Sequence, residues 1–383
     1  MSAKSYQPSP RWLWPTRGGQ AGLQKELIMN VGIVGYGFYI PVYRIKAEEI
    51  AKAWQQNFHQ IKSSLLIEEK SVPGIDEDSV TFAVNAAKNS LLQCGLNSKE
   101  INAIYVGSES APYAVKPTAT IVGAAIGADS FCMAADMEFA CKAGTAALGV
   151  CLGLVKSGFA KFGMAIGTDT AQASPGDILE YSAGAGAAAF ILGTDDSKII
   201  ANIEDTISIA SDTPDFWRRS MQKYPEHAGR FTAEPAYLKH VSTIVKKIFE
   251  KHSCGPEAFD YVVFHQPNGK LPLMVAKSLG FKSEQINPGF VVQDIGNTYS
   301  ASSLLGLCSV LDQAQPDKKI LLVSYGSGSG CDAFILKTTQ NIKKLINSGV
   351  GPGYDLKSHL SYKKYLTYSE YRRNIDLLYQ DMK

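Results

Sequence analysis

The sequence carries no large excess of charge of either sign. Its 383 residues include 38 Lys and Arg against 36 Asp and Glu, which leaves a formal net charge of +2. A net charge this small does not attract a whole chain to nucleic acid or to a membrane surface. We therefore expect neither of these partners. A local basic cluster for a phosphorylated ligand remains compatible with the average.

Paired cysteines are also absent. Seven cysteines are scattered along the chain, and none of them stands in CxxC spacing. Most lie in apolar runs, as buried and reduced thiols of cytosolic proteins do. The pattern favours a cytoplasmic location, and we expect no metal and no cofactor.

Long apolar runs are missing as well. The most apolar stretch, residues 143–155, is rich in Gly and Ala, and it is too short to span a bilayer. The first 28 residues contain Pro, Gly and Ser and lack the apolar segment of a signal peptide. We interpret residues 1–28 as an N-terminal extension that is disordered or not native.

Apolar strand patterns alternate with amphipathic helix patterns along the rest of the chain, which predicts a layered α/β fold with a buried sheet. The same order recurs in two parts, and this suggests an internal duplication. We expect an N-terminal half at 29–205, a C-terminal half at 206–340 and a helical extension on the surface at 341–383. The clearest expected helices are 78–92, 141–157 and 301–313, and the clearest expected strands are 102–107, 162–167, 261–264 and 320–324.

Cys141 is a candidate nucleophile. The segment EFACKAGTAAL (138–148) places this thiol just before a run of small residues that predicts a helix. Backbone N–H groups and the positive end of the helix dipole at such a terminus favour the thiolate, which is the nucleophilic form. Taken alone, the segment also fits a buried structural cysteine before a close-packed helix.

Glu109 and His265 each follow a predicted buried strand, where α/β proteins often bind ligands. Glu109 stands in VGSES, and a semi-apolar cleft there would raise its pKa and suit it to general-base work. His265 stands in FHQPNGKLP, where a neutral imidazole can donate to a carbonyl oxygen or exchange a proton. The alternatives are a solvated loop glutamate and a hydrogen-bonded structural histidine.

Two further segments could supply hydrogen-bond donors. Asn297 precedes a predicted helix, either as a cap or as a donor that completes an oxyanion hole with His265. The segment SYGSGSG (324–330) is either a plain turn or a loop that directs backbone N–H groups toward one oxygen. Cysteine, histidine, asparagine and a Gly/Ser loop, in this order, form a thiolase-type layout.

Together these segments resemble the 3-hydroxy-3-methylglutaryl-CoA (HMG-CoA) synthases of the thiolase superfamily, most closely the archaeal type. The resemblance covers about Asn30 to the C-terminus. It implies a thiolase-like α/β fold with duplicated βαβαβαββ halves in five α-β-α-β-α layers, usually as a homodimer. The motifs that carry it are VGSES, EFACKAGTAAL, PGDILEYSAGAGAAAF, DTPDFWRR, GRFTAEPAY, VFHQPNGKLP, GNTYSAS and SYGSGSG.

The resemblance also implies a reaction of the mevalonate pathway of isoprenoid biosynthesis. Cys141 would take the acetyl group of acetyl-CoA, and Glu109 would remove a methyl proton from it. The resulting carbanion would add to acetoacetyl-CoA, whose carbonyls His265 and Asn297 would polarise. Backbone N–H groups of Cys141 and Ser327 would hold the acetyl oxygen, and hydrolysis would release HMG-CoA.

Substrate contacts follow from the same resemblance. Ser182 and Thr232 match positions that meet the acyl portion, and Arg230 and Lys270 match positions that meet CoA phosphates, a sensible use of positive charge. Met274 departs from the pattern, because archaeal relatives often carry a basic residue there. This departure puts one CoA contact in doubt and leaves the chemistry untouched.

The archaeal resemblance further implies a complex with an acetoacetyl-CoA thiolase and a small zinc-ribbon/OB-fold scaffold protein. Other functions stay open at this point. The chain could be a ketoacyl synthase III-like condensing enzyme, a subunit of a phloroglucinol-type acetyltransferase complex, or a catalytically silent subunit of a thiolase-like assembly. The joint presence of Glu109, Cys141 and His265 favours the synthase.

Overall fold

The computed structural model describes residues 30–170, 173–347 and 355–378, and the expected extension at 1–28 lies outside them. The strands are β1 (Gly32–Tyr39), β2 (Tyr43–Lys46), β3 (Glu69–Val72), β4 (Ile101–Gly107), β5 (Met133–Met137), β6 (Phe162–Asp169), β7 (Gly186–Gly193), β8 (Ala201–Thr213), β9 (Phe216–Trp217), β10 (Glu226–His227), β11 (Tyr261–Phe264), β12 (Lys319–Gly326), β13 (Gly328–Thr338) and β14 (Lys364–Tyr365).

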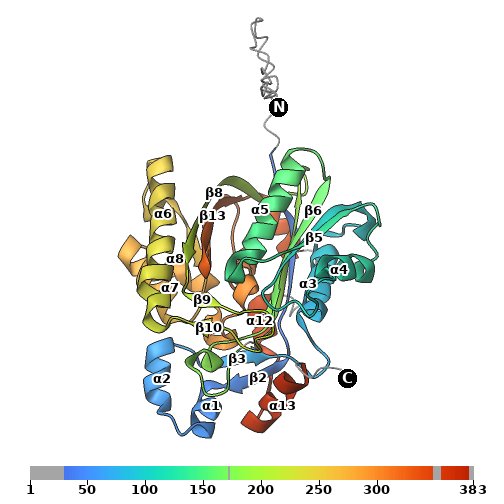
Figure 1. Ribbon diagram of the computed structural model, residues 1–383. Helices are drawn as coiled ribbons and strands as arrows, with labels where there is room; N and C mark the ends of the chain where they lie inside the picture. The colour runs from blue at the N-terminus through green and yellow to red at the C-terminus, as the bar shows by residue number, and fades with distance from the viewer. Residues whose placement is uncertain (1–29, 171–172, 348–354, 379–383) are drawn as a thin grey trace, which may run out of the picture.

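The helices pack against these strands (Figure 1). They are α1 (Ala47–Ala53), α2 (Phe58–Leu65), α3 (Ser79–Cys94), α4 (Thr118–Ile126), α5 (Ala143–Lys156), α6 (Lys239–His252), α7 (Lys270–Leu279), α8 (Ser283–Ile286), α9 (Val292–Ile295), α10 (Ser302–Leu311), α11 (Ile342–Asn347), α12 (Leu356–Ser361) and α13 (Tyr368–Leu378). No helix among the described residues has both the length and the apolar character that a membrane span needs.

The main sheet has nine strands in the order β11-β12-β13-β8-β1-β7-β6-β4-β5. At its centre β1 and β8 pair antiparallel. Outward from β1, the pairings with β7 and then β6 are antiparallel and the pairing of β6 with β4 is parallel. Outward from β8, the pairings through β13 and β12 to β11 repeat this sequence of directions. The suggested internal duplication is therefore visible in the strand arrangement.

The repeat begins with β8, which corrects one domain boundary. The predicted division between residues 205 and 206 falls inside β8 (Ala201–Thr213). Strand continuity places the division in the loop between Gly193, where β7 ends, and Ala201. The physical reason is that β8 pairs with β1 through its first residues and with β13 along most of its length, so it cannot be split.

Alternate side chains of the strands face different groups of helices. On β12, Ile320 and Leu322 belong to a central apolar cluster with residues of α5 and α10, whereas Leu321 and Val323 face a cluster with α6 and α7. In the N-terminal half, strand residues such as Ile104 face α3 and α4. The central helices α5 and α10 thus lie between strands of the two halves, and α3 and α6 cover the outside (Figure 1). The predicted mixed α/β fold with a buried sheet is confirmed.

The C-terminal extension is more than the surface helix that its polar sequence predicts. Strand β14 adds to β2 in a small sheet with β3, and on α13 both Tyr371 and Ile375 are only 1% exposed. The carboxylate of Glu180, itself fully buried, accepts a hydrogen bond from the Tyr368 hydroxyl at 3.0 Å. The polar tyrosines of this extension therefore form hydrogen bonds with buried groups of the core. Polarity along the sequence alone predicted an exposed helix.

Candidate active site

Glu109, Cys141 and His265 each lie in a segment that follows the carboxyl end of a strand. Gly107 of β4 pairs in parallel with Met137 of β5, so the segments that lead to Glu109 and Cys141 emerge side by side. In the other half, β11 and β12 also run parallel, and the backbone N–H of His265 donates to the carbonyl of Val323 at 2.8 Å. Both sets of ends lie at the edge where α/β sheets commonly bind ligands.

Cys141 and Glu109 are in direct contact. The Cys141 thiol donates to Oε1 of Glu109 at 3.2 Å, and Cys141 is only 6% exposed. Burial, and then the nearby Asp169 carboxylate, raise the pKa of Glu109 to about 8. The direction of this shift agrees with the expectation for Glu109, and the contact with buried Cys141 argues against a freely solvated loop glutamate.

The expectation that the helix terminus makes Cys141 a thiolate is wrong for this state of the protein. Cys141 lies in a single 3₁₀ turn, η2 (Ala140–Lys142), directly before α5. Burial, and then the Glu109 carboxyl group, raise the pKa of the Cys141 thiol well above its ordinary value. Loss of solvation and a neighbouring acid outweigh the partial charge of the helix end.

Asp169, at the end of β6, holds the Glu109 segment in place. Its Oδ1 accepts from the Glu109 N–H at 2.9 Å and from the hydroxyls of Ser108 at 3.0 Å and Ser110 at 2.5 Å. Its Oδ2 accepts from the N–H of Ser300 at 2.9 Å. A fully buried carboxylate thus joins the loop of the proposed base to the segment that follows Asn297 in the other half.

His265 is buried and neutral. It is 1% exposed, and burial lowers its pKa to about 3. Its Nδ1 has no hydrogen-bond partner among the described residues. Its carbonyl accepts from the Tyr237 hydroxyl at 2.6 Å, which fixes the backbone at this point. A neutral ring with an unpartnered buried nitrogen is compatible with the predicted role as a donor to a carbonyl oxygen, which stays a prediction.

Asn297 uses its side-chain oxygen within the chain, and its predicted role as a donor stays a prediction. Its Oδ1 accepts from the N–H of Tyr299 at 2.9 Å, the first residue of the turn η8 (Tyr299–Ala301) before α10. Since the oxygen is used, the amide N–H₂ is the end left for a ligand. The backbone of Asn297 pairs with Ala183, and both Ala183 and Tyr299 pack in one cluster with Cys141.

The SYGSGSG segment is a tight hairpin rather than an open loop. Ser324 to Gly326 end β12, Ser327 makes the turn, and Gly328 begins β13. The carboxylate of Asp215 accepts from the Gly328 N–H at 2.7 Å and from the Tyr325 hydroxyl at 2.6 Å, so it holds both sides of the turn.

Two residues of the site adopt left-handed backbone conformations that are rare for residues other than glycine. Ala140, just before Cys141, has φ 41°, and Tyr299, just after the Asn297 segment, has φ 50°. Such conformations are unfavourable in isolation and gather at functional sites, where the surrounding packing holds them. They indicate that tertiary contacts, and not local preference, shape both turns.

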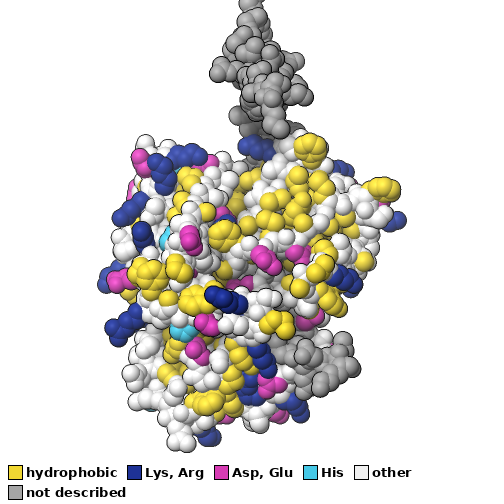
Figure 2. Space-filling model, in the orientation of Figure 1, with side chains coloured by type: hydrophobic (Ala, Val, Ile, Leu, Met, Phe, Trp, Pro, Cys, Tyr) yellow, Lys and Arg dark blue, Asp and Glu magenta, His cyan; other side chains and the backbone are white. Residues whose placement is uncertain are grey.

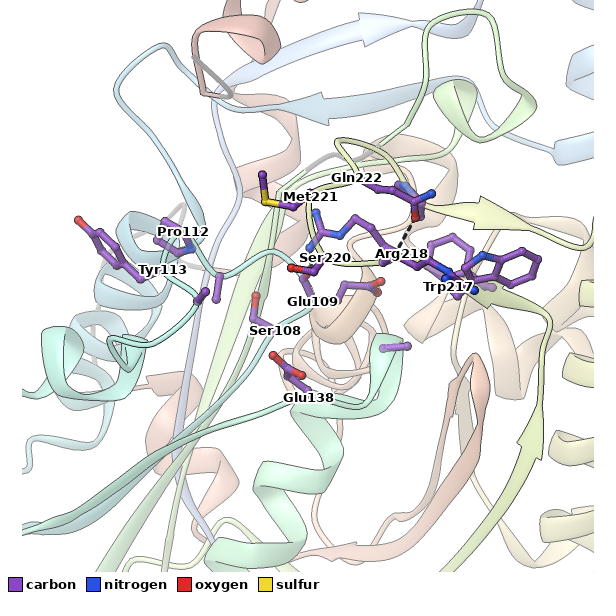
Figure 3. Close-up of a pocket in the computed structure, with 16 residues that line it drawn as sticks. Ser108, Glu109, Pro112, Tyr113, Glu138, Trp217, Arg218, Ser220, Met221 and Gln222 are labelled. Carbon is purple, nitrogen blue, oxygen red and sulfur yellow. Dashed lines mark hydrogen bonds between the residues drawn. The ribbon is translucent and has the colours of Figure 1, made fainter. Parts of the chain in front are cut away.

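A pocket of about 510 Å³ opens beside Glu109 (Figure 3). Ser108, Glu109 and Glu138 lie on its strand side, and the loop with Trp217 and Arg218 faces them. The guanidinium of Arg218 donates to the carbonyl of Glu109 at 2.8 Å. Cys141, His265 and Asn297 do not line this pocket. Of the four predicted catalytic residues, only Glu109 borders it.

The predicted substrate contacts differ in exposure. Ser182 is 5% exposed, and its carbonyl accepts from the Asn297 N–H at 2.6 Å, so it lies beside the predicted donor. Thr232 is half-buried in the turn η4 (Gly229–Thr232), and its hydroxyl donates to the Asp215 carbonyl at 3.0 Å. Arg230 and Lys270 are exposed, the second at the first position of α7.

Sequence reasoning overlooked Asp169, Asp215 and Arg218 as parts of the site. Asp169 is a polar residue at the end of a fully buried strand. The same kind of position identified His265 as a candidate. Asp215 and Arg218 stand in DTPDFWRR, a motif that carried the resemblance without a role for either residue. Within the described residues, no group of three or more His, Cys, Asp or Glu side chains is placed to hold a metal ion.

Comparisons with known proteins identify the family. The family model of the C-terminal part of 3-oxoacyl-[acyl-carrier-protein] synthase III matches residues 249–338. The hydroxymethylglutaryl-CoA synthase of Methanopyrus kandleri is 57% identical over 344 residues, which are 90% of this chain and 97% of that protein. That of Archaeoglobus fulgidus is 53% identical over 346 residues, which are 90% of this chain and 99% of that protein.

Solved structures agree with this assignment. A crystal structure of HMG-CoA synthase complexed with CoA superposes with a TM-score of 0.81 at 25% identity, covering 93% of this chain and 92% of that one. The HMG synthase of the curacin biosynthetic pathway, in complex with an acetyl donor-ACP, has a TM-score of 0.79 at 23% identity and covers 90% of this chain and 88% of its own; it supports the fold alone. By the identity to its archaeal relatives, the chain belongs to the hydroxymethylglutaryl-CoA synthase family.

Proposed function

We propose that this protein condenses acetyl-CoA with acetoacetyl-CoA and water to give 3-hydroxy-3-methylglutaryl-CoA and CoA. The reaction passes through an acetyl thioester on Cys141 and belongs to the mevalonate pathway. The observation that carries the proposal is the contact of 3.2 Å between the Cys141 thiol and the carboxyl group of half-buried Glu109, whose pKa is raised to about 8. A nucleophile and a base of adjusted pKa then share one site.

In the first step, the sulfur of Cys141 attacks the carbonyl carbon of acetyl-CoA. The thiol proton leaves for a base, and ionised Glu109 is the group in contact with it. The C–S bond to CoA breaks, and CoA departs as a thiol once it is protonated. The N–H groups of Cys141 and Ser327 are the proposed donors to the oxyanion that forms on the acetyl carbonyl.

In the second step, Glu109 removes a proton from the acetyl methyl group, and the carbanion attacks the ketone carbon of acetoacetyl-CoA. His265 and Asn297 donate to the acceptor carbonyls, a role that suits a neutral imidazole and a free amide N–H₂. Protonated Glu109 then returns its proton to the new alkoxide. Water finally hydrolyses the thioester on Cys141, which frees the thiol and leaves the product carboxylate.

We assign recognition of the CoA phosphates to two exposed positive charges. Arg230 and Lys270 are both exposed and free to meet phosphates, while Thr232 and Ser182 lie deeper, where the acyl portion would run. The chemistry uses groups of the chain itself, and acetyl-CoA and acetoacetyl-CoA are substrates rather than cofactors.

The test is a product assay by mass spectrometry with labelled acetyl-CoA and acetoacetyl-CoA. We expect labelled HMG-CoA from the wild-type protein, a mass increase of one acetyl group on the protein without acceptor, and neither from Cys141→Ala. Acetyl transfer to the protein in Cys141→Ala would overturn the proposal. Parallel reactions with acetoacetyl-ACP decide whether the acceptor is carried by CoA or by a carrier protein.

A second condensing function has one observation in its favour. The family model that matches residues 249–338 describes ketoacyl synthase III enzymes, and a subunit of a phloroglucinol-type complex would share the same general chemistry. These enzymes do not need Glu109. Full activity of Glu109→Ala in acyl transfer, without HMG-CoA formation by the wild type, would favour this alternative.

A homodimer is part of the proposal, and strand β5 is its proposed interface. Within the described chain β5 ends the nine-stranded sheet, and all five of its residues are half-buried. Apolar side chains gather over β5 and α5 (Figure 2). Phe131, two residues before β5, and Val115, three residues before α4, are 92% and 93% exposed. An open edge with apolar neighbours is a surface that proteins usually cover. Sedimentation of wild type and Phe131→Asp tests this.

We also propose a cytoplasmic location and a complex with an acetoacetyl-CoA thiolase and a zinc-ribbon/OB-fold scaffold protein. The cysteines of the described chain are all free, in keeping with a reducing compartment. A complex would pass acetoacetyl-CoA directly between enzymes. Purification from the native cells of a fully active synthase without either protein would count against the complex.

A further inference from the structure

Lys142, the residue directly after Cys141, is a buried cation. It is 6% exposed, and its Nζ lies 3.1 Å from each carboxylate oxygen of Asp332, which is 2% exposed. Lys142 belongs to the turn η2 of the N-terminal half, whereas Asp332 belongs to β13 of the C-terminal half. The pair therefore joins the nucleophile turn to the strand that leaves the Ser327 turn.

The carboxylate of Asp332 is held by further hydrogen bonds. Its Oδ1 accepts from the Ser208 hydroxyl at 2.8 Å, and its Oδ2 accepts from the Thr145 hydroxyl at 2.8 Å. The Thr145 hydroxyl also lies 2.6 Å from that of Ser324 in β12. A buried ion pair adds little stability unless such bonds satisfy it, but it has one preferred geometry. The network gives Lys142 a fixed position.

The stem of Lys142 lies against two glycines that flank the Ser327 turn. A Cβ added to Gly326 would come within 2.9 Å of Lys142 Cγ, and one added to Gly330 would come within 2.9 Å of Lys142 Cε. The ring of Phe139 covers the ammonium group at 4.1 Å. Only residues without a side chain leave room for this lysine against the paired glycines of the hairpin.

We propose that Lys142 and Asp332 are positioning residues that hold the Cys141 turn at a fixed separation from the backbone of Ser327. This separation would allow the N–H groups of both residues to bind the acetyl oxygen. The inference rests on the proposed function, in which Cys141 and Ser327 N–H groups bind that oxygen. Because the pair is neutral as a whole, it acts through geometry and does not supply charge to the thiol. It touches neither substrate nor the reacting sulfur.

The test compares two reactions of the same thiol in the double variant Lys142→Met with Asp332→Asn. Removing both charges leaves no unpaired buried ion, so this variant stays folded where a single substitution would not. Alkylation by iodoacetamide forms no oxyanion, whereas acetyl transfer from acetyl-CoA does. We expect alkylation at the wild-type rate, an unchanged KM for acetyl-CoA, and acetyl transfer slower by about 10²-fold, the effect of a displacement near 1 Å.

The matched control removes the exposed pair between Lys161 and Glu100 through Lys161→Met with Glu100→Gln, and it should change neither reaction. Acetyl transfer at the wild-type rate in the folded double variant would overturn the inference, as would an equal slowing of alkylation. If the proposed function itself is wrong, the Cys141→Ala variant will still accept an acetyl group. This result is distinct from either outcome in the double variant.

Discussion

Oε1 of Glu109 lies 3.2 Å from the sulfur of Cys141, within hydrogen-bond distance of the atom that would carry the acetyl group. A methyl group attached through that thioester is therefore within reach of the carboxylate. Burial is the main cause of both raised pKa values; the contact itself raises the pKa of Cys141 further, whereas the hydrogen bond from the thiol lowers that of Glu109. One contact thus links acyl transfer to proton abstraction.

The pH dependence of the condensation step follows from Glu109. Only the ionised carboxylate accepts a methyl proton, and its pKa is raised to about 8. We expect the single-turnover rate of C–C bond formation to rise about tenfold per pH unit below that value and to level off above it. His265, with its pKa lowered to about 3, stays neutral throughout. A rate that is flat between about pH 6 and pH 8 would contradict this assignment.

Glu109→Gln should separate the two steps. The amide cannot take a methyl proton, so we expect the condensation rate to fall by about 10²- to 10⁴-fold. Acetyl transfer to Cys141 should fall less, because other bases, water included, can accept the thiol proton. Labelled acetyl-CoA measures acetyl transfer, and HMG-CoA formation measures the whole reaction. Equal losses in both assays would assign Glu109 to the first step alone.

The same substitution should stabilise the fold at alkaline pH. Glu109 has an ordinary pKa of 4.5 and a pKa of about 8 in the folded protein. Between these values the folded state binds a proton that the unfolded state has released, so the stability that Glu109 contributes is lost as pH rises. We expect Glu109→Gln to melt a few °C above wild type at about pH 8 and near it at about pH 4.5. Scanning calorimetry measures both, and a gap that widens toward acid pH would be the contrary result.

Asp169→Asn should disturb the base more than the nucleophile. One oxygen of Asp169 accepts from the N–H of Glu109 and from the hydroxyl of Ser110, and an amide in its place can turn a donor toward them. We expect condensation to slow by at least about tenfold, the result of a small displacement of the base. Alkylation of Cys141 should stay near the wild-type rate. A variant that alkylates slowly and condenses normally would show that Asp169 supports the thiol instead.

Glu180 should be essential for the C-terminal helix. Its fully buried carboxylate accepts from Trp54 at 3.0 Å and from Tyr368 at 3.0 Å, and it lies 3.7 Å from the guanidinium of Arg372. Glu180→Ala removes the buried acceptor that these three side chains share, although Trp54 and Tyr368 keep a bond to each other and Arg372 keeps Asp376 and Tyr224, and we expect a loss of about 1–3 kcal/mol of unfolding free energy. Urea denaturation measures it, with the exposed Glu48→Gln on α1 as control. Equal stability of both variants would refute the role.

Met274 offers a gain-of-affinity test of the CoA contacts. It lies on α7, four residues after Lys270 and on the same face, and it is 43% exposed. Met274→Lys adds a second cation beside Lys270, and we expect KM for acetyl-CoA to fall by about two- to fivefold at low salt. The gain should vanish at high salt because exposed charges are screened. An unchanged KM at low salt would mean that the phosphates bind elsewhere.

Several parts of the site were predictable because their signals are local. A polar residue directly after a buried strand indicated Glu109 and His265, and a cysteine before a run of small residues indicated Cys141. The structure places all three at the carboxyl ends of strands, as that pattern requires. Asp169 has the same position at the end of a buried strand. It was not predicted as a site residue, because an acidic residue at the end of a strand more often faces solvent.

The sequence by itself determined the alternation of strands and helices, the candidate nucleophile, base and donors, and the family. Only the tertiary structure decided the protonation of Cys141, the boundary at β8 and the partnership of Lys142 with Asp332. The physical reason is that pKa values and buried ion pairs depend on which distant segments exclude water from a group. A pattern along the chain shows that Cys141 precedes a helix, but not that Glu109 comes within 3.2 Å of it.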